Sequence, residues 1–349
     1  MRATSTTDDD TVSWQRKNSI VDIPQGSVDL VQDYHEFLSQ QVKEQDASKP
    51  SHDKVLQRTR RVAAAAATND FGAAEYRCLE TGGFLLPTVS FHPSYKSLLA
   101  WRNNSLEPSD FCVLDLGCGL AADGRRMLLD GFATHLVAVD RSELYLKLGC
   151  EMFGEEPDRV VTTVARFKED QEKGSLLGYP MVTFLAADVS AGKQAEEDDD
   201  DIIKPIQLAL QRQKQQQQKD QEIIINAQQQ KMGSLNMSNS AALPLFNAVY
   251  AGKFLHCLET KENLRIVLRR VWKLLSDQQG CLFGVYGRNY RPQFECASKE
   301  AFEKALVQEG FSPSLIEEEA GGATWFCAFK KNIDDKSAET IVMPTERDK

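Results

Sequence analysis

The chain has 349 residues, 42% of them hydrophobic, which is enough to bury at least one large core. Its 51 acidic and 41 basic residues give a net charge of −10 without a basic stripe, so nucleic acid is not an expected partner. The eight cysteines form no CxxC pair, and there is no apolar leader and no apolar run near ~20 residues. These features favour a cytoplasmic protein without a membrane partner.

The N-terminal part of the chain predicts a tail followed by a helical cap. Residues 1–54 are polar apart from Tyr34–Leu38, and they predict a disordered tail with one short helix. Residues 55–109 form the predicted cap. It begins with a helix that ends near Gly72, and it contains a second helix that starts at Ser94, after the turns around Pro87.

Residues 110–333 alternate between apolar strands and amphipathic helices. The predicted strands cover residues 111–117, 135–140, 182–190, 245–252, 280–287 and 323–332. The predicted helices cover residues 122–131, 142–154, 262–277 and 298–311. Continuous apolar strands between such helices are typical of a parallel sheet that is covered on both faces. We therefore expect an α/β domain with a Rossmann-like, doubly wound, mostly parallel seven-stranded sheet, followed by a C-terminal tail at 334–349.

A glutamine-rich insertion interrupts this domain at residues 191–243. Residues 202–211 have the composition of a crossover helix, whereas the remainder is of low complexity and has no core-forming periodicity. Lengthening a surface loop costs only ~0.6 kcal/mol per doubling. The sequence thus favours a tolerated surface insertion, and a partner-binding segment is the alternative.

The stretch VLDLGCGLAADG, which starts at Val113, predicts a strand, a glycine turn and a helix. Gly117 and Gly119 let the backbone approach a ligand, and the helix start offers free N–H donors. The run GCGLAA also satisfies the dinucleotide pattern G-x-G-x-x-A. However, Asp115 at the end of the strand would repel a pyrophosphate, whereas it would attract the ammonium and sulfonium of S-adenosylmethionine. The alternative for Asp115 is a turn-capping role.

Two further carboxylates follow the next two predicted strands. Asp140 ends one strand, where a carboxylate can accept two hydrogen bonds from a ribose diol. Asp188 ends the other, where it can meet the amine and ring nitrogens of adenine. Alone, either residue could be a turn aspartate or a helix N-cap. Together with Asp115 they predict a nucleoside site at one edge of the sheet.

These residues resemble the class I S-adenosylmethionine-dependent methyltransferases. A narrower similarity lies in YRCLETGGFL, HPSY, LDLGCG, DGRRMLLDG, LGCEMF, AADV and AGKFLHCL, which resemble the small-molecule methyltransferases of fungal meroterpenoid pathways. That resemblance implies S-adenosyl-L-methionine as the cofactor. The residues expected to contact it are Asp115, Gly117, Cys118, Gly119, Asp140, Arg141, Ala187, Asp188, Val189, Tyr250 and Ala251.

The segment after the fourth predicted strand is expected to lie beside the transferred methyl group. His256 is the candidate catalytic base or substrate anchor, with a packed helix residue as the alternative. Lys253 is a candidate to attract a carboxylate substrate, with a solvated lysine as the alternative. His92 and Tyr95 are candidates to close the acceptor pocket, with helix packing as the alternative.

The favoured function is methylation of a small molecule, with O-methylation of a carboxylate or hydroxyl in secondary metabolism as the expected chemistry. A protein or RNA methyltransferase is the second hypothesis, and a non-catalytic cofactor-binding module is the third. An oxidoreductase is disfavoured by Asp115. No metal is expected, and the sequence leaves the oligomeric state open.

Overall fold

The computed structural model describes residues 23–42, 50–68, 85–104, 110–155, 161–163, 182–190, 199–228, 243–252, 254–258, 260–277, 280–287, 298–319 and 322–331. Within these ranges the helices are α2 (Gln25–Val42), α3 (His52–Thr68), η3 (Val89–Phe91), α5 (Tyr95–Asn103), α6 (Ala122–Leu129), α7 (Glu143–Phe153), α10 (Asp199–Gln228), η5 (Leu255–Cys257), α11 (Lys261–Leu274) and α12 (Lys299–Gln308). The strands are β1 (Cys112–Leu116), β2 (His135–Asp140), β3 (Val161–Thr163), β4 (Val182–Ala186), β5 (Ala248–Gly252), β6 (Cys281–Gly287), β7 (Phe311–Glu318) and β8 (Ala323–Lys330).

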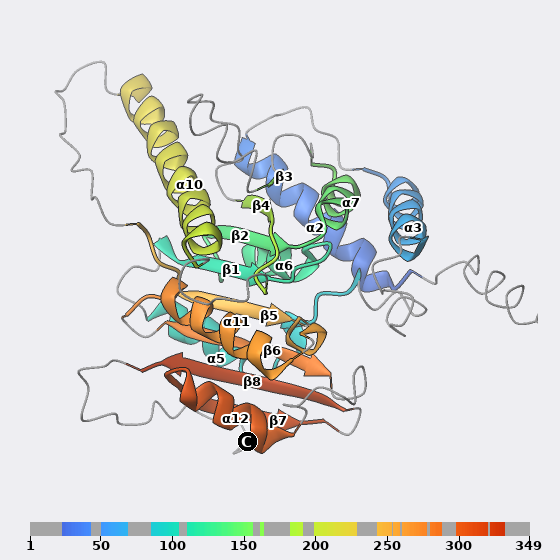
Figure 1. Cartoon of the computed structure of the whole chain (residues 1–349). Coiled ribbons are helices and arrows are strands. Elements are labelled where there is room, and N and C mark those ends of the chain that lie inside the picture. The colour runs from blue at the N-terminus through green and yellow to red at the C-terminus, as the bar shows by residue number, and fades with distance from the viewer. Residues whose placement is uncertain are drawn as a thin grey trace, which may run out of the picture.

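One sheet organises the described residues, with its strands in the order β3-β4-β2-β1-β5-β6-β8-β7 (Figure 1). The pairs from β3 across to β6 are parallel. Only β8 is antiparallel to its neighbours β6 and β7. Because the chain leaves β1 first toward β2 and later returns to β1's other side with β5, the sheet is doubly wound. The predicted Rossmann-like fold is confirmed, with eight strands in the described sheet where seven were expected, and β3 and β7 are the two strands for which no range was predicted.

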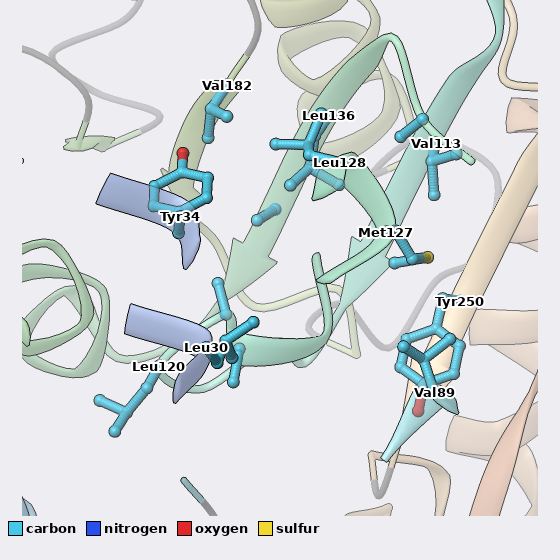
Figure 2. Packing of buried hydrophobic residues seen from close by; sticks show 14 of the residues in the cluster. Leu30, Tyr34, Val89, Val113, Leu120, Met127, Leu128, Leu136, Val182 and Tyr250 are labelled. Atoms are coloured by element: carbon cyan, nitrogen blue, oxygen red, sulfur yellow. The ribbon is translucent and has the colours of Figure 1, made fainter. Parts of the chain in front are cut away.

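Two hydrophobic clusters cover the two faces of the sheet. Alternate residues of β1 belong to opposite clusters, with Val113 in one and Leu114 in the other. The first cluster contains α2, α3, α5, α6 and α7, and Figure 2 shows part of it, including Leu30 and Tyr34 of α2. The second contains α10, α11 and α12. Burial of strands on both faces explains why they appear in the sequence as continuous apolar runs.

The one short helix predicted within the otherwise disordered tail at residues 1–54 is longer in the structure than expected. Residues Gln25–Val42 form an 18-residue helix that packs on the domain. Val28, Val31 and Tyr34 are buried, and their spacing places them on one face of that helix. Burial of this apolar face stabilises a helix whose composition is otherwise polar. Residues 1–22 and 43–49 lie outside the described residues.

The glutamine-rich insertion also contributes more than a surface loop, because helix α10 runs for 30 residues from Asp199 to Gln228. Ile206, Ala209 and Leu210 are buried against the sheet. Gln213 Nε2 then donates to Leu136 O at 2.7 Å and to Thr183 Oγ1 at 2.9 Å. The insertion therefore supplies a covering helix well beyond residue 211. In the described ranges, neither α10 nor any other helix is long and apolar enough to span a membrane.

Replacing Gln213 by alanine is expected to lower the free energy of unfolding by about 1–3 kcal/mol. The change removes two hydrogen bonds, one buried and one partly buried, and each such bond contributes about 0.5–1.5 kcal/mol. Thermal unfolding checks this, with Gln218→Ala as the control because Gln218 is exposed on the same helix. An equal melting temperature for the two variants would show that the Gln213 bonds do not hold α10 to the sheet.

Candidate functional site

The candidate site lies at the carboxyl edge of the parallel strands. The turn after β1, Asp140 at the end of β2 and Asp188 just beyond β4 come together there, since β4, β2 and β1 are neighbours in the sheet. The register pairs Leu116 with Val139, and Asp140 with Ala186. The structure thus brings together the three strand ends that the sequence singled out. Open α/β sheets bind their ligands at this edge.

The turn from β1 into α6 contains three residues with left-handed backbone. Gly117 has φ +64°, Gly119 has φ +54° and the non-glycine Ala121 has φ 54°. A Cβ at Gly119 would meet no atom within 4 Å, whereas one at Gly117 would lie 2.5 Å from the Phe254 ring. Gly119 therefore presents bare backbone to open space. Gly117 is covered by a side chain that the sequence analysis did not single out.

Asp115 lies on β1 with a side chain that is only 1% exposed. Its Oδ2 is buried and has no hydrogen-bond partner, and a Cβ at Gly124 of α6 would lie 2.9 Å from this atom. Burial, followed by the charge of Asp123 and then that of Asp140, raises the pKa of Asp115 well above its usual value. A hydrogen bond from the Gly124 N–H and the charge of Arg125 oppose that rise in pKa. Ionising such a buried carboxyl costs free energy, and a cationic partner would offset that cost. The unpartnered oxygen is therefore suited to a positively charged ligand.

Asp140 links the second strand to the glycine turn. Its Oδ2 accepts from the Gly119 N–H at 2.8 Å, and its Oδ1 accepts from the Ser142 N–H at 2.8 Å. Burial raises the pKa of Asp140, although both backbone donors oppose that rise. Each oxygen retains one acceptor position, since a carboxylate offers about four. Asp140 can therefore hold the turn and still accept from a diol.

The remaining predicted cofactor residues fall into two environments. Asp188 is exposed, and its Oδ1 accepts from the Ser190 N–H at 2.9 Å and the Ser190 hydroxyl at 2.6 Å. Arg141 is exposed as well. In contrast, Ala187, Val189 and Ala251 are buried, and Cys118 is partly buried. Their contact with a cofactor stays a prediction.

The hydroxyl of Tyr250 in β5 belongs to a hydrogen-bond network that the sequence analysis did not predict. Its hydroxyl lies 2.9 Å from Thr88 Oγ1, which donates to Asp123 Oδ2 at 3.0 Å. The Val89 N–H donates to the other oxygen of Asp123 at 2.7 Å. Burial and the charge of Asp123 raise the pKa of Tyr250, so the phenol is protonated. This network fastens the segment before α5 to the first turn of α6, beside Asp115.

The predicted substrate residues of the cap are buried within the fold. His92 Nε2 lies 2.9 Å from Phe326 O, and its Nδ1 accepts from the Ser94 N–H at 3.1 Å. Burial lowers the pKa of His92 to about 4, so the imidazole is neutral. The Tyr95 hydroxyl donates to Asp130 Oδ2 at 3.1 Å. The proposed roles of these two residues in an acceptor pocket stay predictions.

The two candidate substrate and catalytic residues after β5, Lys253 and His256, lie largely outside the described residues. Lys253 is not among the described residues, and only the backbone of His256 is, within the 3₁₀ helix Leu255–Cys257. The ring of Phe254, two residues before His256, covers Gly117, so this segment contacts the glycine turn. Local spacing gave no signal for that contact, because the two residues are far apart in the chain.

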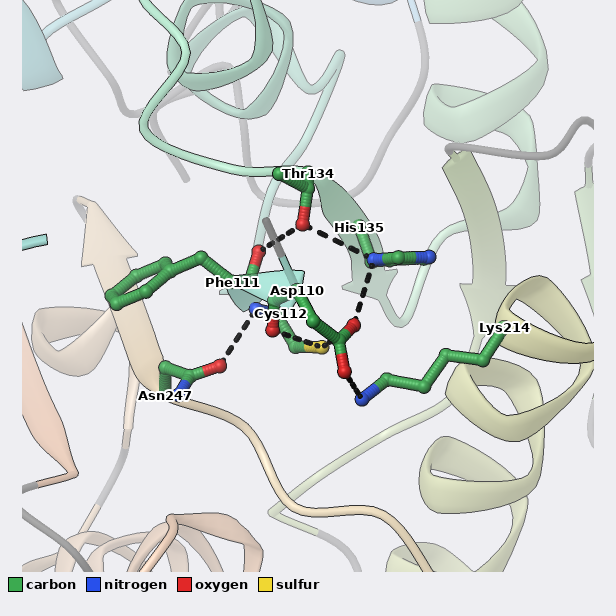
Figure 3. A network of polar contacts seen from close by, with 7 residues as sticks. All are labelled: Asp110, Phe111, Cys112, Thr134, His135, Lys214 and Asn247. Atoms are coloured by element: carbon green, nitrogen blue, oxygen red, sulfur yellow. Dashed lines mark hydrogen bonds and ion pairs between the residues drawn. The ribbon is translucent and has the colours of Figure 1, made fainter. Parts of the chain in front are cut away.

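The opposite edge of the sheet carries a separate polar network (Figure 3). Among the described residues, one group of three donors is close enough to hold a metal ion, namely Asp110, Cys112 and His135. However, Lys214 Nζ of α10 lies 2.6 Å from Asp110 Oδ2. Burial lowers the pKa of His135, which keeps its ring neutral. The lysine ammonium supplies the positive charge that Asp110 needs, and the pair fastens α10 to the sheet.

Comparisons with models of protein families and with curated proteins find no match. Among solved structures, the pyocyanin biosynthetic protein PhzM has 11% identity and a TM-score of 0.39, over 77% of this chain and 64% of PhzM. The chain thus spans less than two thirds of that protein. An amino pentose methyltransferase from Micromonospora echinaspora, solved with S-adenosylmethionine bound, has 13% identity and a TM-score of 0.35, over 69% and 92% of the two chains.

An S-adenosylmethionine-dependent methyltransferase from Mesorhizobium loti is similar at 14% identity and a TM-score of 0.36, over 69% of this chain and 100% of that one. The latter two neighbours are described as methyltransferases, but a likeness at this level assigns no activity. The fold of this chain is established by its own strand order. Its function has to be argued from the residues at the carboxyl edge.

Proposed function

We propose that the chain is an S-adenosylmethionine-dependent methyltransferase that acts on a small molecule. The observation that carries this proposal is Asp115, a buried carboxylate with one unpartnered oxygen in the strand that leads into the glycine turn. A ligand with a positive charge lowers the energy of such a group, and one with a negative charge raises it.

The residues present fit this cofactor. Asp115 would hold its cationic end, Asp140 would accept from its ribose diol, and Asp188 and the Ala187 backbone would hold its adenine. When bound, the cofactor supplies a methyl group on a sulfonium, which is already an activated leaving group. The protein then has to align the acceptor and exclude water, and alignment alone can lower a barrier by roughly 7–11 kcal/mol. The buried Tyr250 and Ala251 at the end of β5 support one wall of this site.

A nicotinamide dinucleotide fits the same edge less well. Its pyrophosphate would lie over the glycine turn, close to Asp115, Asp123 and Asp140, and the charges of the latter two already raise the pKa of Asp115. Like charges at a few ångströms repel even at an intermediate dielectric. This argument disfavours the oxidoreductase alternative, although the turn matches the dinucleotide pattern.

Calorimetry with purified protein tests the choice of cofactor. We expect S-adenosylmethionine and its demethylated product, S-adenosylhomocysteine, to bind, and NAD to bind at least about tenfold more weakly, which corresponds to 1.4 kcal/mol. Tighter binding of NAD than of either compound would refute the proposal.

For the acceptor, we propose a small carboxylic acid or hydroxyl compound of secondary metabolism, in keeping with the resemblance to the meroterpenoid enzymes. A screen with methyl-labelled cofactor tests this against small acids, small alcohols, protein and RNA. Label in protein or RNA would favour the second hypothesis. Tight binding without transfer to any acceptor would favour a non-catalytic module. The cytoplasmic location is part of the same proposal.

Replacing His256 by alanine separates three roles for that residue. As a general base it would contribute about 10²–10⁴-fold to turnover. As an anchor for a carboxylate acceptor it would chiefly lower KM. We expect slower transfer by a well-folded His256→Ala variant, with cofactor affinity unchanged. A lower melting temperature at an unchanged rate per folded molecule would instead identify a packed residue.

A further inference from the structure

A fully buried arginine lies directly under the glycine turn. The Arg125 side chain is 0% exposed, and its Nη1 donates to Leu120 O at 2.7 Å and to Ala121 O at 3.2 Å. These two carbonyls belong to the left-handed end of the turn, one residue beyond Gly119. Ala121 O also accepts the first helical bond of α6, from the Arg125 N–H at 3.2 Å, so the backbone and the side chain of Arg125 both hold this carbonyl, and a charged donor fixes its direction strongly.

Helix α7 holds the same carbonyl from another side. A Cβ at Gly149 would lie only 2.6 Å from Leu120 O, so the helix can approach this close only because residue 149 has no side chain. Ala121 is left-handed at φ 54°, a conformation that costs energy for a residue with a Cβ and persists only where its surroundings impose it. Arg125 and Gly149 are the surroundings that impose it here.

The arginine in turn depends on partners from outside the turn. Its Nη2 pairs with Glu155 Oε2, and its guanidinium lies over the rings of Phe153 at 4.1 Å and Phe184 at 4.7 Å. Glu155 is completed by the Tyr34 hydroxyl, which donates to Oε1 at 2.8 Å. Hydrogen bonds to the remaining atoms stabilise a buried ion pair, and Tyr34 of α2 supplies the one to the second oxygen of Glu155, whereas Arg125 Nε is buried without a partner.

We propose that Arg125 is a positioning residue for the cofactor-binding turn, and that α2, through Tyr34 and Glu155, belongs to the cofactor-binding unit. This proposal rests on the function proposed above, and it adds an element from outside the Rossmann-like domain. Arg125 does not reach the ligand edge itself. It acts by keeping the turn in the conformation in which the Gly119 backbone is accessible and the Gly119 N–H donates to Asp140.

The consequence is a dependence of affinity on α2. If the turn populates its binding-competent conformation only part of the time, the apparent Kd rises in inverse proportion to that fraction. Loss of the Tyr34 hydroxyl leaves every group at the ligand edge in place. Any loss of affinity must then come through the turn.

Tyr34→Phe tests the proposal, with Gln213→Ala as the matched control. Both changes remove a buried hydrogen bond, but Gln213 lies on the opposite face of the sheet. We expect Tyr34→Phe to raise the Kd for S-adenosylmethionine by about 3–10-fold. Gln213→Ala should change it less than twofold at a comparable loss of melting temperature. A second variant, Arg125→Lys, keeps the charge but cannot contact both carbonyls and Glu155, and we expect a larger rise.

Hydrogen exchange on the ligand-free protein keeps this test independent of the cofactor. We expect the amides of residues 117–121 to exchange faster in Tyr34→Phe than in Gln213→Ala. If wild type binds no S-adenosylmethionine but this difference is present, the proposed function fails and the role of Arg125 stands. If the exchange of these amides and the Kd change equally in the two variants, the positioning role is overturned.

Discussion

Asp115→Asn is expected to stabilise the ligand-free protein and, at the same time, to weaken its binding of S-adenosylmethionine. The pKa of Asp115 is raised by burial and by its acidic neighbours, so ionisation of this group opposes folding. A neutral amide removes that opposition, which we expect to gain on the order of 1 kcal/mol near neutral pH. Loss of the negative charge removes the attraction for a cation and should raise Kd by about 10–100-fold, the scale of hydrogen bonds to charged groups.

The same residue predicts the direction of two pH dependences. Between the ordinary carboxyl pKa of about 4 and the raised pKa in the folded state, the folded protein keeps a proton that the unfolded chain has lost. The free energy of unfolding of the ligand-free protein should therefore fall as pH rises through this window. Affinity for the cofactor should rise over the same window, because a cation prefers the ionised carboxylate.

Thermal unfolding and calorimetry from pH 5 to 8 check both directions. Asp115→Asn should weaken the pH dependence of both the free energy of unfolding and the cofactor affinity. Asp130→Asn is the control, since Asp130 accepts from Tyr95 and Arg126 at the far end of α6. That change should lower the melting temperature and leave cofactor affinity and its pH dependence as in wild type. Stabilisation by Asp115→Asn without loss of affinity would remove Asp115 from the binding site.

Asp140→Ala should weaken cofactor binding by about 10–100-fold, which corresponds to the 1.5–3 kcal/mol of a charge-assisted hydrogen bond. The change removes the acceptor for a diol and also releases the Gly119 N–H. We therefore expect a lower melting temperature together with the loss of affinity.

Ser142→Ala separates these two effects. The Ser142 hydroxyl caps α7 by accepting from the Tyr145 N–H at 3.2 Å, while the Ser142 N–H that bonds Asp140 remains in the variant. We expect it to cost about 1 kcal/mol of stability, typical of an N-cap, with Kd within about twofold of wild type. If calorimetry gives equal Kd values for Asp140→Ala and wild type, the diol is held elsewhere.

The strand–turn–helix around Asp115 could be predicted because its signals are local. An apolar strand, glycines and an amphipathic helix lie within twenty residues, and the carboxyl ends of parallel strands must meet at one edge. Three predicted helices begin next to a serine, and the side chains of Ser142 and Ser298 cap theirs, whereas Ser94 precedes its helix without a capping hydrogen bond. Local sequence was sufficient wherever a single element determined its own structure.

The missed elements depend on contacts that are distant in the chain. Helix α2 has apolar residues at helical spacing, but its overall composition is polar. The helix is stabilised by packing against the domain, and local sequence does not reveal that contact. Arg125 contacts its partners, and Phe254 contacts Gly117, across long separations in the chain. Periodicity rules act over short windows and cannot predict such contacts. β7 was not singled out, because Pro313 argues against a strand interior. It is tolerated there because β7 is an edge strand with an irregular register at that point.

The contact of Phe254 with Gly117 has a consequence for how relatives of this chain can vary. Any side chain at position 117 would overlap the Phe254 ring, so the two positions cannot change independently. An alignment of relatives should show covariation between them, with a residue larger than glycine at 117 accompanied by a small residue at 254. Position 119, where a Cβ would meet no atom within 4 Å, should show no such pairing, and its variation should be limited by its left-handed backbone instead.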